Sequence, residues 1–164
     1  MGAVTDVGVD MPVALQPNTP PAMRERAAIM RIQHECQALP DGHRMDESPP
    51  LRHWLAPGIY AREIHLPANS VVVGKIHKHR HLNILSAGRV TVMTEFGMEE
   101  LTAPASFISE RGTKRVVHTH EAAIWTTIHP NPDDTTDTAE LERMFVAESY
   151  AELGMKVADL EELK

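Results

Sequence analysis

Apolar and polar positions divide the chain into a central region of strand-like runs and two flanks with helical spacing. Between Ile59 and His129, short apolar and β-branched runs such as IYAREIHL, VVVGKIH, RVTVMTE and AAIWTTIH alternate with turn signals. Runs of this length and spacing, with no helical stretch between them, are typical of an antiparallel sandwich or barrel. The sequence therefore predicts a mainly β, antiparallel barrel over residues 58–130.

Each flank predicts one helix. On the N-terminal side, Thr19 and the two prolines after it are typical of a helix start, and apolar residues at helical spacing extend the helix over about residues 21–38. On the C-terminal side, Asp137 and Glu140 form a capping-box-like start, and Gly154 is placed to end the helix. The tail beyond Gly154 is compatible with a second short helix.

The chain length and the positions of prolines and glycines predict one domain with extensions. A chain of 164 residues suits a single ordinary domain. Four prolines and two glycines punctuate residues 40–58, which predicts a connecting loop that covers the barrel. The expected parts are a flexible arm (residues 1–19), a helix with its covering loop (20–57), the barrel (58–130) and an acidic helical extension (131–164).

Charge and composition narrow the possible partners. Of the 23 acids and 16 bases, ten acids and three bases fall in residues 131–164, which leaves thirteen of each in the rest of the chain. A nucleic-acid binder needs a basic face, so no nucleic-acid partner is expected. No apolar stretch approaches the roughly 18 to 20 residues of a membrane span, and the N-terminus lacks a secretory signal. We therefore expect a cytoplasmic protein without a membrane partner.

Histidines carry the candidate chemistry. Seven of the ten fall between residues 65 and 129, most densely in GKIHKHRHLNILSAG, whereas the single cysteine, Cys36, excludes a multi-cysteine zinc site. On one straight strand His77 and His81 would lie about 13 Å apart, too far for two metal bonds of about 2.1 Å. A shared metal therefore requires a turn around His79, which places His77 and His81 on one face. Alternatively, His79 and His81 chelate as a pair.

Two later strands offer further candidates. His118 and His120 share a strand face, either as a solvent-facing edge or with one of them functional. His120 is preferred because Glu121 follows it. His129 ends a strand on the same face as Trp125, so it points into the barrel either as a ligand or as a hydrogen-bonded core histidine.

The run around the first histidines resembles the first motif of the cupin family. That motif is a glycine, a His-x-His pair, three or four residues, a glutamate, six residues and a glycine. Gly74 opens the run and Gly88 closes it. By this alignment His81 stands where the family has glutamate, His77 matches the second histidine, and Lys75 replaces the first.

The second cupin motif is met in part. Gly97 and Pro104 are present with one residue too many between them, and Gly112 is followed by Arg115 where the family has its histidine. A ligand from this strand would then be His118 or His120. The strings GKIHK, HLNILSAG, APASFIS, GTKRV and WTTIH further resemble small cupin-like proteins of phages and prophages, which carry no assigned activity.

Arg115 takes an inward-facing position in this alignment. A buried guanidinium needs an acidic partner or an anionic ligand, because an unpaired buried charge is costly. Two interpretations stay open: Arg115 anchors a carboxylate or phosphate of a small molecule, or it forms an internal salt bridge with Glu95 or Glu121.

The resemblance implies a cupin-type jelly-roll barrel that binds a metal and acts on, or binds, a small anionic organic ligand. His77, His81 and His120 would hold the metal, Glu121 would act as acid or base, and Arg115 would orient the ligand. Imidazole ligands suit iron, zinc, nickel or copper. Further candidates for the site are His129, His118, His79 and Glu95.

Two other functions compete with a metal enzyme. The barrel could serve as the scaffold of a non-catalytic structural or host-interaction module of phage origin, which the replaced motif histidines favour. Less favoured is a binder that sequesters a nucleotide-like ligand. In either case a homodimer is expected, because cupin barrels commonly pair, with residues 1–58 of one chain covering a sheet edge of the other.

Overall fold

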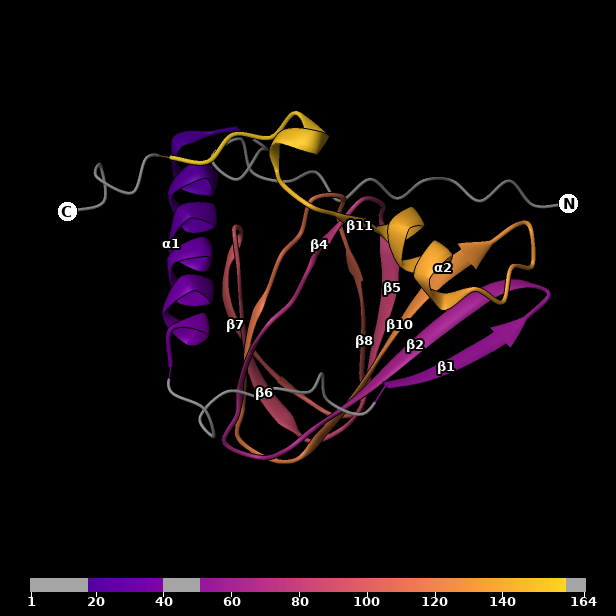
Figure 1. The fold of residues 1–164 in the computed structure, drawn as a ribbon. Helices are drawn as coiled ribbons and strands as arrows, with labels where there is room; N and C mark the ends of the chain where they lie inside the picture. Colours follow the sequence, from indigo (N-terminus) through magenta and orange to yellow (C-terminus); the bar gives the residue numbers. More distant parts are fainter. Residues whose placement is uncertain (1–17, 40–50, 159–164) are drawn as a thin grey trace, which may run out of the picture.

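Two β-sheets face one another in the computed structural model, which describes residues 18–39 and 51–158 (Figure 1). Every strand pairing within these residues is antiparallel. The mainly β, antiparallel fold class predicted from the sequence is confirmed. No helix in the described ranges is long and apolar enough to cross a membrane.

The strand order is that of a jelly roll. The elements in chain order are α1 (Pro20–Gln37), β1 (Leu51–Ala56), β2 (Gly58–Leu66), β3 (Val71–Val73), β4 (Ile76–His77), β5 (His81–Ala87), β6 (Arg89–Thr94), β7 (Gly97–Thr102), β8 (Ala105–Ser109), β9 (Val116–Thr119), β10 (Ala123–Asn131), α2 (Thr138–Phe145), β11 (Val146–Ala147) and η2 (Ala151–Leu153). One sheet has the order β1-β2-β10-β5-β8, the other β3-β9-β6-β7, and β4 pairs with β11. Between β2 and β10, apart from β4, the chain alternates between the two main sheets except from β6 to β7, which is the double-sheet architecture of jelly rolls.

Inward-facing side chains fill the space between the sheets. In β6, Val90 and Val92 are buried and their neighbours are partly exposed, the period of two expected of a strand with one face on the core. The central cluster consists of Leu66, Leu85, Val90, Val92, Val117, Ala123 and Trp125. Because Leu85 and Val90 flank the β5–β6 turn, this core fills the end of the barrel opposite the start of β5.

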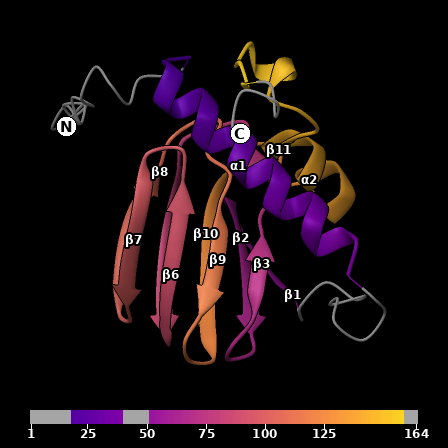
Figure 2. The same ribbon diagram turned by 90° about the vertical axis from the view of Figure 1, so that its left-hand side faces the viewer.

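Helix α1 crosses the outer side of the four-stranded sheet (Figure 2), and a buried ion pair helps to hold it there. Arg26 of α1 lies 3.6 Å from Glu95 (Nη2 to Oε1), and neither side chain is exposed. The same arginine donates through Nη1 to the carbonyl oxygen of Lys156 (3.0 Å). Glu95, a candidate site residue in the sequence, thus anchors the helix to the barrel through Arg26, which also holds the C-terminal segment.

The N-terminal flank departs from the prediction at one strand. Helix α1 begins after Thr19 and ends at Gln37, close to the predicted range. Residues 51–56, expected in the covering loop, form β1 and pair with β2 along their whole length. The predicted arm and residues 40–50 of the predicted loop lie outside the described residues.

The C-terminal flank departs from the prediction at its helix end. Asp137 caps α2, accepting hydrogen bonds from the backbone N–H groups of Ala139 and Glu140. The helix ends at Phe145 because Val146 turns to extended backbone and pairs with β4. Gly154, expected to end α2, instead ends the short η2 with a φ of 68°. The predicted second helix of the tail lies largely outside the described residues.

Candidate metal centre

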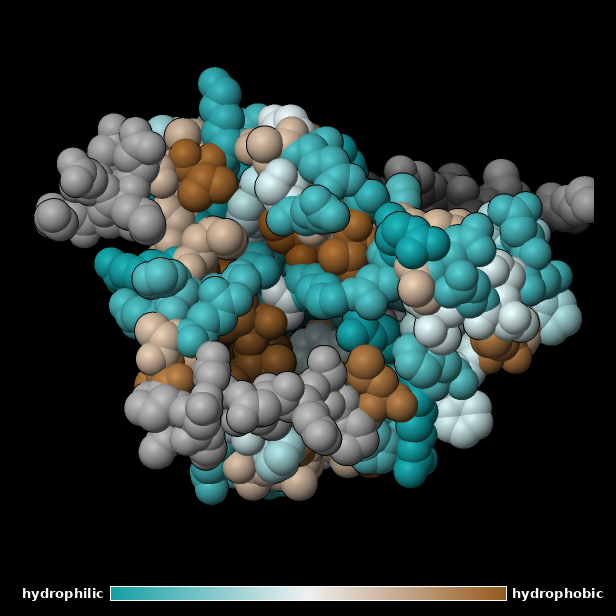
Figure 3. Space-filling view, in the orientation of Figure 1, coloured by the Kyte–Doolittle hydropathy of each residue, from teal (hydrophilic) through white to brown (hydrophobic). Residues whose placement is uncertain are grey.

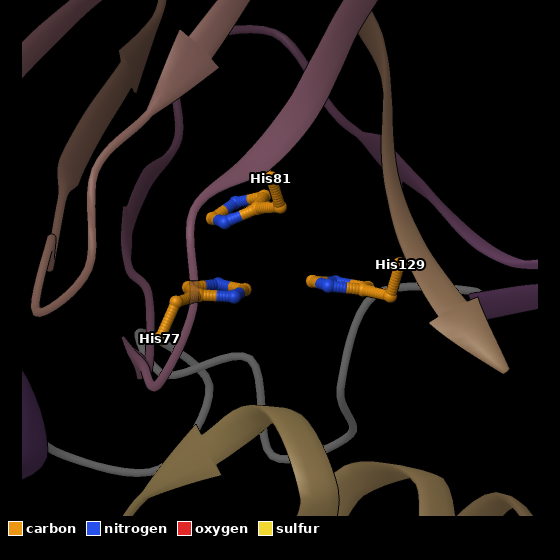
Figure 4. Close-up of side chains that lie close together, drawn as sticks. All are labelled: His77, His81 and His129. Atoms are coloured by element: carbon orange, nitrogen blue, oxygen red, sulfur yellow. The ribbon is translucent and has the colours of Figure 1, made fainter. Parts of the chain in front are cut away.

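Three histidines from three strands converge at one end of the barrel (Figure 4). His77 ends β4, His81 begins β5 and His129 lies near the end of β10. One nitrogen from each ring lies within 4.8 Å of the other two, and all three residues are buried. In the described part of the chain no other group of His, Cys, Asp or Glu side chains meets this condition. We call these residues the histidine triad.

The turn that a shared site requires over residues 78–80 is present. It brings the His77 and His81 ring centroids to 4.2 Å. The strand pairing differs from the hairpin considered from the sequence, because β4 pairs with β11 and not with β5. The backbone N–H of Lys78 donates to the carbonyl oxygen of Phe145 (2.8 Å). The C-terminal segment therefore supports the turn that joins the two histidines.

Each ring of the triad has one buried nitrogen without a hydrogen-bond partner: Nδ1 of His77, Nε2 of His81 and Nδ1 of His129. Buried polar atoms are normally hydrogen-bonded, so three such atoms in one place indicate a missing partner. In His81 the other nitrogen, Nδ1, lies 3.0 Å from the carbonyl oxygen of His79, to which only a protonated Nδ1 can donate. This contact leaves the lone pair on Nε2 free for a metal.

Burial keeps the three imidazoles neutral. Burial, together with the nearby His81 and Arg115, lowers the pKa of His77 to about 2. Burial likewise lowers the pKa of His81 to about 4 and that of His129 to about 3. Because a metal ligand must be unprotonated, the triad can bind a cation at neutral pH without first releasing protons.

The donor set fits a divalent transition metal. Imidazole nitrogens bind such metals at about 2.0–2.1 Å, which places neighbouring ligand atoms about 3.4 Å apart in a tetrahedral site. One nitrogen of each triad ring lies within 4.8 Å of the other two, so side-chain rotations that move these nitrogens by about an ångström would bring them to metal-binding distances. Three protein ligands leave a position open for water or a ligand.

Aromatic side chains form one wall of the site. The Phe145 ring of α2 stacks on His129 with centroids 4.3 Å apart, and the Tyr60 ring of β2 stacks on Phe145 at 5.9 Å. The Tyr60 hydroxyl lies 2.7 Å from Nδ1 of His53 on β1. Strand β1 and helix α2 together cover the triad on this side.

Two cavities of about 210 Å³ each reach His77. One lies under α2, and Glu142 is its only acidic lining residue among those described. The other lies inside the barrel between β2 and β3, where Arg62, Lys75 and Arg115 line it together with His77. No acid among the described residues lines it, although Lys75 is ion-paired with Glu142. Figure 3 shows a hollow in the face of this view with hydrophobic side chains beside it. The interior cavity is therefore a positively charged space next to the triad.

Arg115 lies in the barrel interior. Its guanidinium carbon is 5.4 Å from the Trp125 ring centroid and 5.9 Å from that of Phe107. Only 7% of the residue is exposed, and its Nη2 has no hydrogen-bond partner. Burial lowers the pKa of Arg115 to about 10, although Glu95 acts in the opposite direction, so the group stays charged at neutral pH. Within the described ranges no ion pair joins Arg115 to Glu95 or Glu121.

His120, expected as the third ligand, lies at the other end of the barrel. Its backbone N–H donates to the carbonyl oxygen of Arg89 (2.8 Å), just after the β5–β6 turn, whereas His81 begins β5. The seven residues of β5 separate the two positions by about 20 Å. His120 is therefore too far away to share a metal with His77 and His81, and His129 is the histidine that joins them.

The other candidate residues also lie outside the triad. His118 is exposed, and its ring centroid is 4.7 Å from that of His120. Glu121, expected as acid or base, is exposed beside the same pair, with Oε1 3.6 Å from Nε of Arg89. The His79 side chain is exposed in the turn, and its carbonyl oxygen lies 3.0 Å from Nδ1 of His81.

Sequence reasoning missed Arg62, Tyr60 and Phe145. A signal was available for the first two, because the alternation in IYAREIHL puts Tyr60 and Arg62 on the same strand face as Ile64, which lines the interior. Phe145 carried no comparable signal. Its contact with His129 depends on how α2 docks against the barrel.

Comparisons with known proteins find similarity among solved structures. No protein-family model and no curated protein matches it. A cupin-2 domain protein from Shewanella frigidimarina is 11% identical, with a TM-score of 0.43 over 53% of this chain and 85% of its own. A cupin 2 domain-containing protein from Halorhodospira halophila is 17% identical, with a TM-score of 0.45 over 63% and 79%. Salicylate 1,2-dioxygenase from Pseudaminobacter salicylatoxidans is 10% identical, with a TM-score of 0.49; the alignment covers 74% of this chain and 35% of the dioxygenase.

Proposed function

We propose that the protein binds a divalent transition metal through His77, His81 and His129 and uses this site to bind, or act on, a small anionic organic ligand. The observation that supports the metal is the convergence of three buried imidazoles, each of which also has a nitrogen without a hydrogen-bond partner. A metal ion would give each of these lone pairs the partner it lacks. Iron, zinc, nickel and copper all suit an all-imidazole site.

The cavity between β2 and β3 supports an anionic ligand. Arg62, Lys75 and Arg115 line it beside His77, and no acid among the described residues does. An incoming carboxylate would supply the acceptor that the buried Arg115 guanidinium lacks, in a charge-assisted hydrogen bond. The cavity volume of about 210 Å³ limits the ligand to a small molecule.

A bound metal would supply Lewis-acid polarisation or an activated water. The protein's own residues would position the ligand and control water: Arg62 and Arg115 hold the negative charge, while Tyr60 and Phe145 screen the triad. Glu142 replaces Glu121 as the candidate proton carrier, because it lines the cavity under α2 that His77 and His129 also line. Its carboxylate is ion-paired with Lys75.

Metal analysis of protein purified without a histidine tag tests the proposal. After reconstitution with iron, nickel, copper or zinc, we expect about one ion per chain, measured by inductively coupled plasma mass spectrometry. A stoichiometry near zero after all four reconstitutions would overturn the metal proposal. The alternative would then be the non-catalytic scaffold module. The homodimer, the phage-type resemblance and the cytoplasmic location remain predictions.

A further inference from the structure

A larger cavity in the barrel contains none of the triad histidines. It has a volume of about 750 Å³ and lies between the edge strands β7 and β8. We call it the β7–β8 cavity. Its large apolar lining residues are Val92, Phe96, Met98, Leu101, Phe107 and Ile108. Polar and charged residues, among them Ser109 and Arg115, complete the lining. A concave surface that combines apolar side chains with polar groups is typical of a small-molecule site.

Arg115 lies where this cavity adjoins the one between β2 and β3, and it lines both. Its guanidinium packs against Phe107, which lines the β7–β8 cavity, and against Trp125, which lines the other. Its Nη2 is buried without a hydrogen-bond partner. Leaving a charged donor unpaired in the interior is costly, so this group calls for an anionic acceptor.

A directed chain of hydrogen bonds provides a second donor to the β7–β8 cavity. The Trp125 indole Nε1 donates to Oδ1 of Asn83 (3.0 Å). Because an indole N–H can only donate, this contact orients the Asn83 amide, whose Nδ2 then donates to Oγ of Ser109 (2.8 Å). With Oγ used as an acceptor, the Ser109 O–H remains available as a donor, and Ser109 lines the cavity.

No described acid neutralises these donors from within the cavity. Glu110 is held by Arg80, with Oε1 3.0 Å from Nε, and Glu99 is exposed. Glu95, whose charge acts on Arg115, is ion-paired with Arg26 at 3.6 Å. A carboxylate entering the cavity would supply an acceptor for Arg115 and Ser109.

We propose that the β7–β8 cavity binds a hydrophobic carboxylate such as a medium-chain fatty acid. A carboxylate has two acceptor oxygens and no donor, which matches the two donors of Arg115 and Ser109. The apolar chain would lie among Val92, Leu101 and Phe107. The site shares Arg115 with the proposed metal-site ligand but requires no metal, so the two proposals fail separately.

Isothermal titration calorimetry on the full chain, before and after metal removal with EDTA, tests the ligand class. The probes are octanoate, decanoate and the neutral 1-octanol. We expect decanoate to bind about 15-fold more tightly than octanoate, at roughly fourfold per buried methylene. We expect octanoate to bind at least tenfold more tightly than 1-octanol. Binding of 1-octanol as tight as octanoate, no chain-length dependence, or binding only in the presence of metal would overturn the proposal.

Matched variants test the location. Leu101→Trp fills the β7–β8 cavity and Val72→Trp fills the cavity between β2 and β3; both residues are partly buried, on opposite edge strands of one sheet. We expect Leu101→Trp and Arg115→Met each to weaken decanoate binding at least tenfold, and Val72→Trp to retain it. Circular dichroism checks that each variant folds. Unchanged decanoate binding in Leu101→Trp, or loss of binding only in Val72→Trp, would contradict the location. If a variant misfolds, the comparison of octanoate with 1-octanol in the wild-type protein still tests the proposal.

Discussion

Two groups of histidines lie at opposite ends of the barrel and differ in what surrounds their nitrogens. In the triad, burial removes water and leaves one nitrogen of each ring without a partner. The second group is the pair His118 and His120. There His118 is exposed, and Nε2 of His120 lies 2.7 Å from Oγ1 of Thr91. Both groups draw on runs of the sequence with histidines at every second position, HKHRH at residues 77–81 and HTH at residues 118–120. The difference teaches that burial and convergence, rather than spacing, separate a candidate metal site from surface histidines.

The largest expected effect is on metal content. His81→Ala should reduce the bound metal from about one ion per chain to near zero, because two imidazoles hold a transition metal far more weakly than three. The matched control is the double variant His118→Ala/His120→Ala, which should keep full occupancy. Both are measured by metal analysis after identical reconstitution. Loss of metal in the control, or its retention in His81→Ala, would reverse the distinction between the two groups.

The second effect is on stability against acid. The pKa values of about 2, 4 and 3 for His77, His81 and His129 lie below the ordinary value of 6.5. Between pH 6.5 and about 4 the unfolded chain therefore binds more protons than the folded one, and the free energy of unfolding falls as the pH falls. Each buried histidine contributes a slope of up to about 1.4 kcal/mol per pH unit.

Urea denaturation of the metal-free protein at pH 7, 6, 5 and 4.5 measures this slope. Replacing His77 and His129 together by alanine should flatten it, because two of the contributing groups are removed. The double variant His118→Ala/His120→Ala is the matched control for the loss of two histidines. Parallel curves for wild type and the His77 and His129 variant would show that burial does not depress these pKa values.

The smallest effect is expected for Glu121, which lies beside His118 and His120. Glu121 is 63% exposed and is ion-paired with Arg89 at 3.6 Å. Exposed ion pairs contribute about 0–1 kcal/mol, so Glu121→Gln should leave the melting temperature and the metal content nearly unchanged. Thermal denaturation and metal analysis measure both. A loss of metal in this variant would show that Glu121 contributes to metal binding, which contradicts its placement outside the site.

The barrel and the helix starts were predictable because their signals are local. Strand alternation lies within each run, and the starts of α1 and α2 depend on residues next to Thr19 and Asp137. Strand β1 was missed because almost all of its residues are exposed, so it lacks the alternation of a half-buried strand. The end of α2 was missed because it depends on the distant pairing of β11 with β4.

The site was predictable only in part. His77 and His81 could be placed together because strand geometry makes a turn the means of bringing them close. The third histidine was predicted to be His120, whereas the structure places His129 beside the first two. The sequence did not show this because the answer depends on which end of the barrel β9 and β10 each reach. Arg115 could be placed inside the barrel, but its aromatic neighbours and its unpartnered Nη2 depend on the packing of both sheets.

The most direct measurement is crystallography of the metal-reconstituted protein, with anomalous diffraction at the absorption edge of the bound metal. The account predicts one anomalous peak about 2.1 Å from Nδ1 of His77, Nε2 of His81 and Nδ1 of His129. An anomalous peak at His118 and His120, or none at the triad in crystals of reconstituted protein, would contradict it.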